Sequence, residues 1–176
     1  MNSEPAMDQH ELTVQVQRLA GRASLDCLDL EESLKTVLAV LCQMGVGDLT
    51  PADAKGILDG QKQLTSGQAR SAILENIEQE KNLGQVLESA VKARNELVHQ
   101  LPCRCWMVKN DTEFQSLAAQ VKALTKKVTD GVDMLRLVIR ALIEVLLQEN
   151  PHLITPEQRS QLEQVHPNLT VKFESV

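Results

Sequence analysis

Aromatic residues are nearly absent from this sequence of 176 residues, which has no tyrosine, two phenylalanines and one tryptophan. The length is that of a single domain with a sizeable core. Because hydrophobic residues still make up 43% of the chain, that core has to be built from leucine, valine, isoleucine and alanine. We therefore predict one domain over residues 1–176, with its core in residues 12–149 and a short C-terminal helix and tail in residues 150–176.

Cysteines are few, and their spacing suggests neither a disulfide framework nor a metal site. Cys27 and Cys42 stand alone, Cys103 and Cys105 form a C-x-C pair, and no C-x-x-C motif occurs. A structural zinc site needs four ligands, and no other histidine has a spacing that would complete a set with Cys103, Cys105 and His99. We expect reduced thiols, no metal and no cofactor.

The chain also lacks a long apolar run and an excess of positive charge. Its most apolar stretch, residues 138–147, contains Arg140 and Glu144 and is about half as long as the ~20 residues that a membrane span needs. The N-terminus is acidic and polar, unlike a secretory signal, so we expect a soluble, cytoplasmic protein without membrane contact. The net charge of -6 argues against broad phosphate binding but leaves room for a local basic pocket.

Motifs of several enzyme classes are missing, whereas helical periodicity is present throughout. The chain has no Gly-rich phosphate loop, no G-x-S-x-G and no H-E-x-x-H, which argues against a kinase, a conventional hydrolase or a zincin. Apolar residues at helical spacing predict an all-α bundle of four to five helices. The main helices are expected over residues 11–23, 24–44, 83–101 and 111–149, with short pieces in between. The predicted caps and stops are Ser24, Gly45, Pro102 and Asp111.

Arg94 lies in the middle of the apolar stripe of the helix predicted over residues 83–101. At ~100° per residue, six apolar side chains point within about 60° of its direction; they are Leu87, Ala90, Val91, Leu97, Val98 and Leu101. An unpaired guanidinium in such surroundings is costly. Arg94 is therefore either a structural residue paired with Glu31 or Glu32, or a residue retained for chemistry.

The same helix carries a known signature. Asn95 and His99 lie one turn apart on its polar flank, and residues 94–99 have the sequence Arg-Asn-Glu-Leu-Val-His. This segment resembles the R-N-x-x-x-H signature of the HEPN superfamily, and KARNELVHQL over residues 92–101 is similar to the form it takes in many bacterial members. The order of helices resembles the family over residues 12–149.

The HEPN resemblance implies a homodimer in which two copies of this helix face each other, and a metal-independent endoribonuclease with Arg94, Asn95 and His99 as catalytic residues. His99 would act as base or acid, because histidine changes its charge near neutral pH. Arg94 would hold the phosphate and Asn95 would orient it or His99, giving a 2′,3′-cyclic phosphate and a 5′-hydroxyl. Arg104 is expected to contact the RNA.

Two features complicate this interpretation. Arg94 and His99 point ~140° apart on an ideal helix, so we expect them to converge through unwinding before Pro102 or across a dimer. Leu101 occupies the position where family members regulated by a nucleotidyltransferase antitoxin carry a tyrosine. A toxin or defence component would then need another protein inhibitor or antitoxin. The alternative function is a non-catalytic helical dimerisation or regulatory module.

Overall fold

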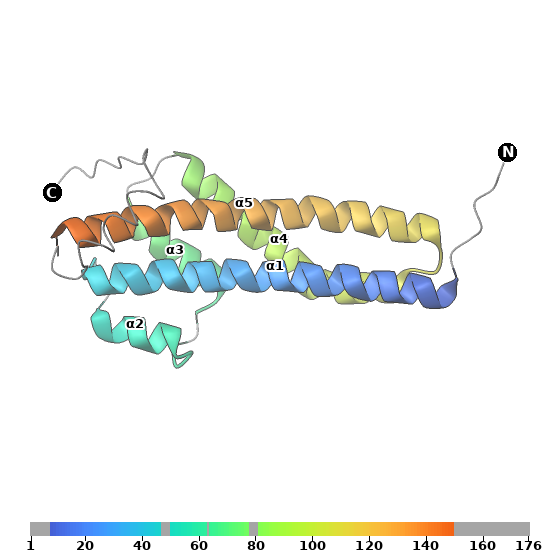
Figure 1. Ribbon diagram of the computed structural model, residues 1–176, viewed down its shortest axis with the longest axis horizontal. Coiled ribbons are helices and arrows are strands. Elements are labelled where there is room, and N and C mark those ends of the chain that lie inside the picture. The colour runs from blue at the N-terminus through green and yellow to red at the C-terminus, as the bar shows by residue number, and fades with distance from the viewer. Residues whose placement is uncertain (1–7, 47–49, 63, 78–80, 150–176) are drawn as a thin grey trace, which may run out of the picture.

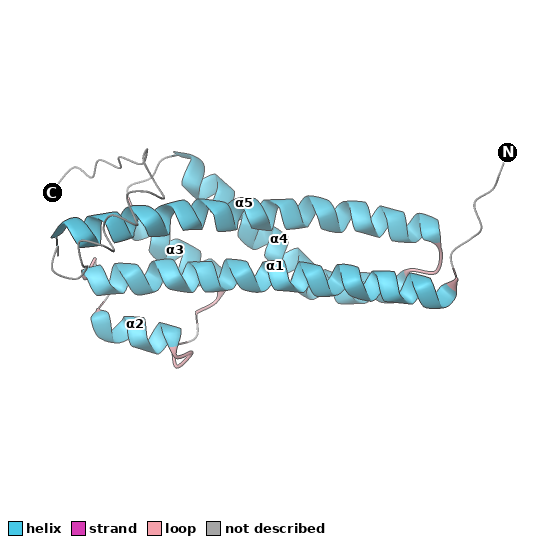
Figure 2. Ribbon diagram, viewed as in Figure 1, coloured by secondary structure: helices cyan, strands magenta, loops and turns pink. Residues whose placement is uncertain are grey.

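The computed structural model describes residues 8–46, 50–62, 64–77 and 81–149, and all regular structure in these ranges is helical (Figure 1, Figure 2). The five helices are α1 (Gln9–Met44), α2 (Pro51–Leu58), α3 (Ser66–Asn76), α4 (Lys81–Met107) and α5 (Asp111–Glu149). The predicted all-α class with four to five helices is confirmed. None of these five helices is long and apolar enough to cross a membrane. The helix and tail predicted in residues 150–176 lie outside the described residues.

Three long helices form the body of the molecule. α1 and α5 run side by side in the same direction, and α4 runs back against both of them (Figure 1). With 36 and 39 residues, α1 and α5 extend over roughly 54 and 58 Å at 1.5 Å per residue. The short helices α2 and α3 pack against the C-terminal half of α1, and α3 also contacts α4. α1 is thus the helix that all the others contact.

The core is aliphatic, as the composition predicts. Burial of each leucine contributes about 1.5–3 kcal/mol. The largest fully buried side chains come from α1, α3, α4 and α5; they are Leu30, Leu34, Val37, Leu38, Leu41, Cys42, Ile73, Leu87, Val128 and Leu135. Phe114 packs in a second, smaller cluster with Leu12 and Val16. The single tryptophan, Trp106, is 89% exposed at the C-terminal end of α4. The core therefore depends almost wholly on leucine, isoleucine, valine and alanine.

Gly131 of α5 lies where the helices α5, α4 and α1 pack closely together. A methyl group built there would lie 2.4 Å from Cβ of Ala90 in α4 and 3.3 Å from Cδ1 of Leu30 in α1. Because such a distance is far inside van der Waals contact, only glycine lets α5 pack this closely against α4. Arg94 follows Ala90 by one helical turn and Glu31 follows Leu30 directly. This crossing therefore fixes the backbones from which both side chains project.

Ser24 does not begin a new helix, contrary to the sequence-based expectation. α1 is continuous from Gln9 to Met44, and the Ser24 hydroxyl donates a hydrogen bond to the Ala20 carbonyl oxygen at 2.9 Å. A serine inside a helix can bond the carbonyl four residues earlier instead of capping. At the other end the prediction is confirmed, because Gly45 ends α1 in the left-handed region with φ of 66°.

Pro102 does not end α4, so this boundary was also predicted wrongly. The helix continues through Pro102 to Met107. A proline removes one backbone hydrogen bond and strains the preceding turn, but Leu101 is buried and Cys105 packs against the core on the next turn. These contacts hold the last turn in place. α5 starts at Asp111 as predicted, although its cap is Asn110, whose Oδ1 accepts from the Glu113 amide at 2.9 Å.

Candidate functional site

Arg94 is half-buried between α4 and α1. Its side chain is 19% exposed, and the neighbouring positions of the predicted stripe are buried; these are Leu87, Ala90, Val91, Leu97 and Leu101. Val98 departs from the prediction, since it is 38% exposed. The helical wheel therefore placed Arg94 correctly at an interface between helices and misplaced one of its neighbours.

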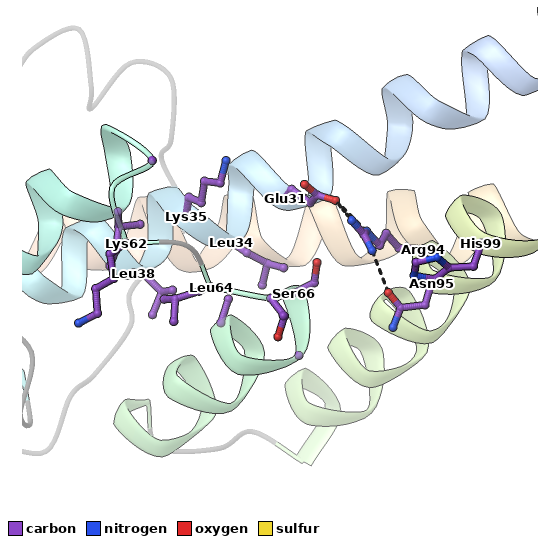
Figure 3. A pocket seen from close by; sticks show the side chains of 15 residues that line it. Glu31, Leu34, Lys35, Leu38, Lys62, Leu64, Ser66, Arg94, Asn95 and His99 are labelled. Atoms are coloured by element: carbon purple, nitrogen blue, oxygen red, sulfur yellow. Dashed lines mark hydrogen bonds and ion pairs between the residues drawn. The ribbon is translucent and has the colours of Figure 1, made fainter.

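An ion pair with Glu31 of α1 holds the guanidinium of Arg94. Oε1 of Glu31 accepts from Nε of Arg94 at 2.8 Å and also from Nη2 (Figure 3). Of the two carboxylates considered from the sequence, Glu31 is the partner, whereas Glu32 pairs with Lys35 at 2.7 Å. Because both partners are only 19% and 26% exposed, the pair is screened less than a surface pair would be.

The ion pair does not saturate Arg94. A guanidinium has five N–H groups, and Glu31 accepts two of them while Oδ1 of Asn95 accepts a third, from Nη1 at 3.0 Å. One N–H on Nη1 and one on Nη2 have no partner among the residues that the structure describes. Arg94 can therefore keep Glu31 and still donate two hydrogen bonds to an anion.

A single pocket brings the three predicted catalytic residues together. Arg94, Asn95 and His99 line one end of a partly open cavity of about 700 Å³ (Figure 3). Asn95 and His99 are exposed on neighbouring turns of α4, which remains helical here. The expected unwinding before Pro102 is therefore absent. The three residues share the pocket within one chain without it.

The rest of the pocket comes from α1 and from the segment that links α2 to α3. Leu34 of α1 and Ser66 lie near the middle of the pocket, and Leu38 and Lys62 lie at the end away from Arg94 (Figure 3). Its rim has three basic side chains and one acidic side chain; these are Lys35, Lys62, Arg94 and Glu31. Each of these three cations is paired with a carboxylate, Lys35 with Glu32, Lys62 with Asp53 and Arg94 with Glu31.

Lys62 is held by Asp53 of α2 through an ion pair of 2.7 Å. Hydrogen bonds from Lys62 and from Thr50 lower the pKa of Asp53 to about 2, and the same bond raises the pKa of Lys62. Asp53 also completes a capping box with Thr50 at the start of α2. An ammonium group has three donors, so this ion pair leaves Lys62 able to bind a second anion.

Arg104, predicted to contact substrate, lies outside this pocket. It donates to Gln100 at 2.7 Å, to Gln120 of α5 at 2.9 Å and to Glu96 at 3.3 Å. The bonds to Gln100 and Glu96 lie within α4, and the bond to Gln120 connects α4 to α5. Arg104 therefore stabilises the packing of α4 against α5. Arg104 does not lie beside Arg94 and His99 in the pocket.

The cysteines form no metal site in the described part of the chain. No cluster of three or more potential ligands occurs there, and all four thiols are free. Burial raises the pKa of Cys27, which lies near Arg94 and Glu31, to about 11, and burial also raises the pKa of Cys105. Such thiols stay protonated at neutral pH and are poor nucleophiles.

Sequence reasoning missed Lys35, Lys62 and Ser66 as pocket residues. One local signal was present: Thr65 and Gln68 form a capping box that marks the start of α3, and Ser66 is the first residue of that helix. Nothing local indicates that Lys62 lies across a pocket from Arg94, because that depends on how α2 and α3 pack on α1.

In comparisons with known proteins, no protein family, no curated protein and no solved structure matches this chain. Membership of the HEPN superfamily therefore stays a prediction that rests on residues 94–99 and on the order of helices. The function has to be argued from the pocket itself.

Proposed function

We propose that this protein is a metal-independent endoribonuclease of the HEPN type, with Arg94, Asn95 and His99 at the catalytic centre. The observation that carries the proposal is that all three side chains line one pocket of a single chain. A half-buried guanidinium with two spare donors is a strong site for one phosphate. An exposed histidine at the same pocket supplies the group that transfers protons.

The proposed reaction is an internal transesterification of RNA. His99 takes the proton of the ribose 2′-hydroxyl, and the 2′-oxygen forms a bond to phosphorus while the bond from phosphorus to the 5′-oxygen breaks. The leaving oxygen takes a proton from water or from His99 of a second subunit. Arg94 stabilises the charge on the phosphate. The products are a 2′,3′-cyclic phosphate and a 5′-hydroxyl.

The biological role that we propose is that of a toxin or defence component, acting as a homodimer and controlled by a protein inhibitor. Support for dimerisation comes from α4, whose exposed face carries Asn95, Val98 and His99 and then Trp106 and Met107 at its end. Large exposed apolar residues beside a polar site are typical of an interface. A dimer would bring two such faces together.

The test compares RNA cleavage by the wild type with cleavage by His99→Ala and Arg94→Ala in buffer that contains a chelator. We expect wild type to cleave RNA and to leave cyclic phosphate ends, and each variant to lose about 10²–10⁴-fold in rate. His10→Ala is the matched control, because His10 is an exposed histidine on α1 that does not line the pocket. Equal rates for wild type, His99→Ala and Arg94→Ala would contradict the proposal.

A second function is favoured by one observation, the ion pair between Arg94 and Glu31 within one chain. If the role of Arg94 is to stabilise the fold through this ion pair, the protein is a non-catalytic helical module for dimerisation or regulation. That function predicts that Arg94→Ala lowers stability while His99→Ala changes nothing. The growth of cells that express wild type, His99→Ala or Arg94→Ala separates the two, because only a nuclease makes wild type more toxic than both variants.

A further inference from the structure

A stretch of α1 that lies outside the pocket carries two exposed leucines. Leu25 is 67% exposed and Leu28 is 54% exposed, and they lie one turn apart on a helix that is continuous from Gln9 to Met44. Neither of them lines the pocket. Because single exposed leucines are common on protein surfaces, the pattern around these two decides whether they form a binding surface.

The two leucines belong to a stripe whose members are spaced alternately by three and by four residues. The stripe consists of five exposed positions: Arg18, Gly21, Leu25, Leu28 and Glu32. At ~100° per residue all five point within about 80° of one another. Alternation of three and four residues is the spacing of the contact positions along a coiled-coil helix. We call these five residues the α1 seam.

The seam has a recess as well as protruding side chains. In a coiled coil each side chain that projects from one helix enters a hole on the facing helix. Gly21 has no side chain, and nothing lies within 4 Å of a methyl group built there. The surface of α1 is therefore open one turn before Leu25, where a leucine of a facing helix can approach the backbone.

Charges of opposite sign lie at the two ends of the seam. Arg18 and Arg22 are exposed at its N-terminal end, and Asp29 and Glu32 are exposed at its C-terminal end. Neither arginine has a carboxylate partner in the described part of the chain. The two carboxylates form exposed ion pairs, with an arginine of α5 at 3.1 Å and with a lysine of α1 at 2.7 Å, and such pairs contribute little.

This distribution of charge fits a second copy of the same seam in antiparallel orientation. With a two-fold axis near Leu25 and Leu28, the leucines of the two copies contact each other. The basic end of each copy then faces the acidic end of the other, and every contact occurs twice by symmetry. A parallel arrangement would instead place like charges opposite each other, which is unfavourable.

We propose that the α1 seam is a self-association surface, on which two copies of this chain pack antiparallel through Leu25 and Leu28. The seam is on a different helix from the exposed face of α4 and uses no pocket residue, so the inference does not rest on the proposed function. It spans only about two heptads, and we expect a dissociation constant on the order of 10–100 µM. If the α4 faces also pair, the seam joins dimers into larger assemblies.

The first experiment follows the full-length protein by sedimentation velocity at concentrations from about 1 to about 500 µM. Wild type is expected to show an association step that Leu25→Asp and Leu28→Asp lose, with circular dichroism melts to confirm that both variants fold. Leu58→Asp is the matched control, because Leu58 is 60% exposed on α2, outside the seam and outside the pocket. If Leu25→Asp associates as Leu58→Asp and wild type do, or if wild type stays monomeric, the proposal is wrong.

Charge reversal then tests the pairing of the two ends. Arg18→Glu and Glu32→Lys are each expected to weaken association about tenfold, because each places like charges opposite each other twice in the pair of copies. An equimolar mixture of the two variants should associate as wild type does, since opposite charges face each other again. Lys127→Glu makes the same charge change on α5 and should have no effect. A mixture that sediments as the separate variants do would overturn the proposal.

Cross-linking with a short bis-maleimide tests the orientation. The cysteine variants are made in a Cys103→Ser background, which removes the exposed native thiol. Leu25→Cys lies near the two-fold axis and should link two copies, whereas the two Arg18→Cys positions lie roughly 20–25 Å apart along an antiparallel pair and should not. Links at both positions would indicate a parallel pair, and links at neither would leave the seam uncovered; either result contradicts the proposal.

Discussion

The two sides of α1 differ in how tightly they are packed. On one side α1, α4 and α5 meet at Gly131, where there is no space for a methyl group. On the other side α1, α3 and α4 leave a pocket of about 700 Å³ that is lined by ion-paired lysine and arginine side chains. The comparison teaches that the packed side supplies the rigidity and the open side carries the side chains with spare hydrogen-bonding capacity.

The largest effect on stability is expected at the packed side. Gly131→Ala should destabilise the protein by about 1–3 kcal/mol, because its methyl group meets Cβ of Ala90, which cannot rotate away. Gly21→Ala is the matched control: it lies in α1 with nothing within 4 Å of the added methyl group, so it should stabilise by about 0.5–1 kcal/mol. Urea unfolding followed by circular dichroism measures both changes. If Gly131→Ala and Gly21→Ala change the free energy of unfolding in the same direction, the helices are not packed as tightly at Gly131 as described.

The ion pair at the boundary between the two sides should have the next largest effect. Arg94→Ala and Glu31→Ala are each expected to cost about 2 kcal/mol, between the values for exposed and for buried pairs. The double variant should cost clearly less than the sum, because the two residues share one interaction. Strict additivity in a double-mutant cycle would mean that the pair contributes nothing to folding.

A smaller effect is expected from Arg104, which lies between α4 and α5 and outside the pocket. Arg104→Ala should lower stability by less than about 1 kcal/mol, since its partners are partly exposed glutamine and glutamate side chains. Any RNA cleavage should keep its KM. An increase in KM would instead support the sequence-based prediction that Arg104 contacts RNA.

The smallest effect is expected from Asp53, the partner of the pocket residue Lys62, and this effect depends on pH. The folded pKa of about 2 is below the value of about 3.9 for an unfolded aspartate. The ion pair with Lys62 therefore stabilises the fold above about pH 4, and this contribution is lost as the pH falls through about 2. The difference in Tm between wild type and Asp53→Asn should shrink over that range. A difference that stays constant from pH 7 to pH 2 would contradict the assigned pKa.

Periodicity along the chain was enough to predict the fold class and the burial of Arg94 against α1, with Glu31 and Glu32 both left as possible partners. Two boundaries were wrong because they relied on single residues. Ser24 bonds backward to Ala20, and the turn after Pro102 is held by Cys105 against the core. In both cases contacts within the helix or with neighbouring helices outweigh a local preference.

The site was only half predictable, for a physical reason. Arg94, Asn95 and His99 lie on one helix, and the resemblance of residues 94–99 to the HEPN signature suggested a common role, although helical spacing points Arg94 and His99 ~140° apart. Lys62 and Ser66 lie on a separate segment, and only the packing of α2 and α3 on α1 brings them to the same pocket.

The exposure of Trp106 has a consequence for spectroscopy. With one tryptophan and no tyrosine, the ultraviolet fluorescence of the protein comes almost entirely from a side chain that is 89% exposed. Its emission is that of an indole in water in the folded chain as well as in the unfolded one. The emission wavelength therefore does not report unfolding of the core. The same indole becomes a selective optical probe of whatever covers the end of α4, because only such contact moves the emission to shorter wavelength.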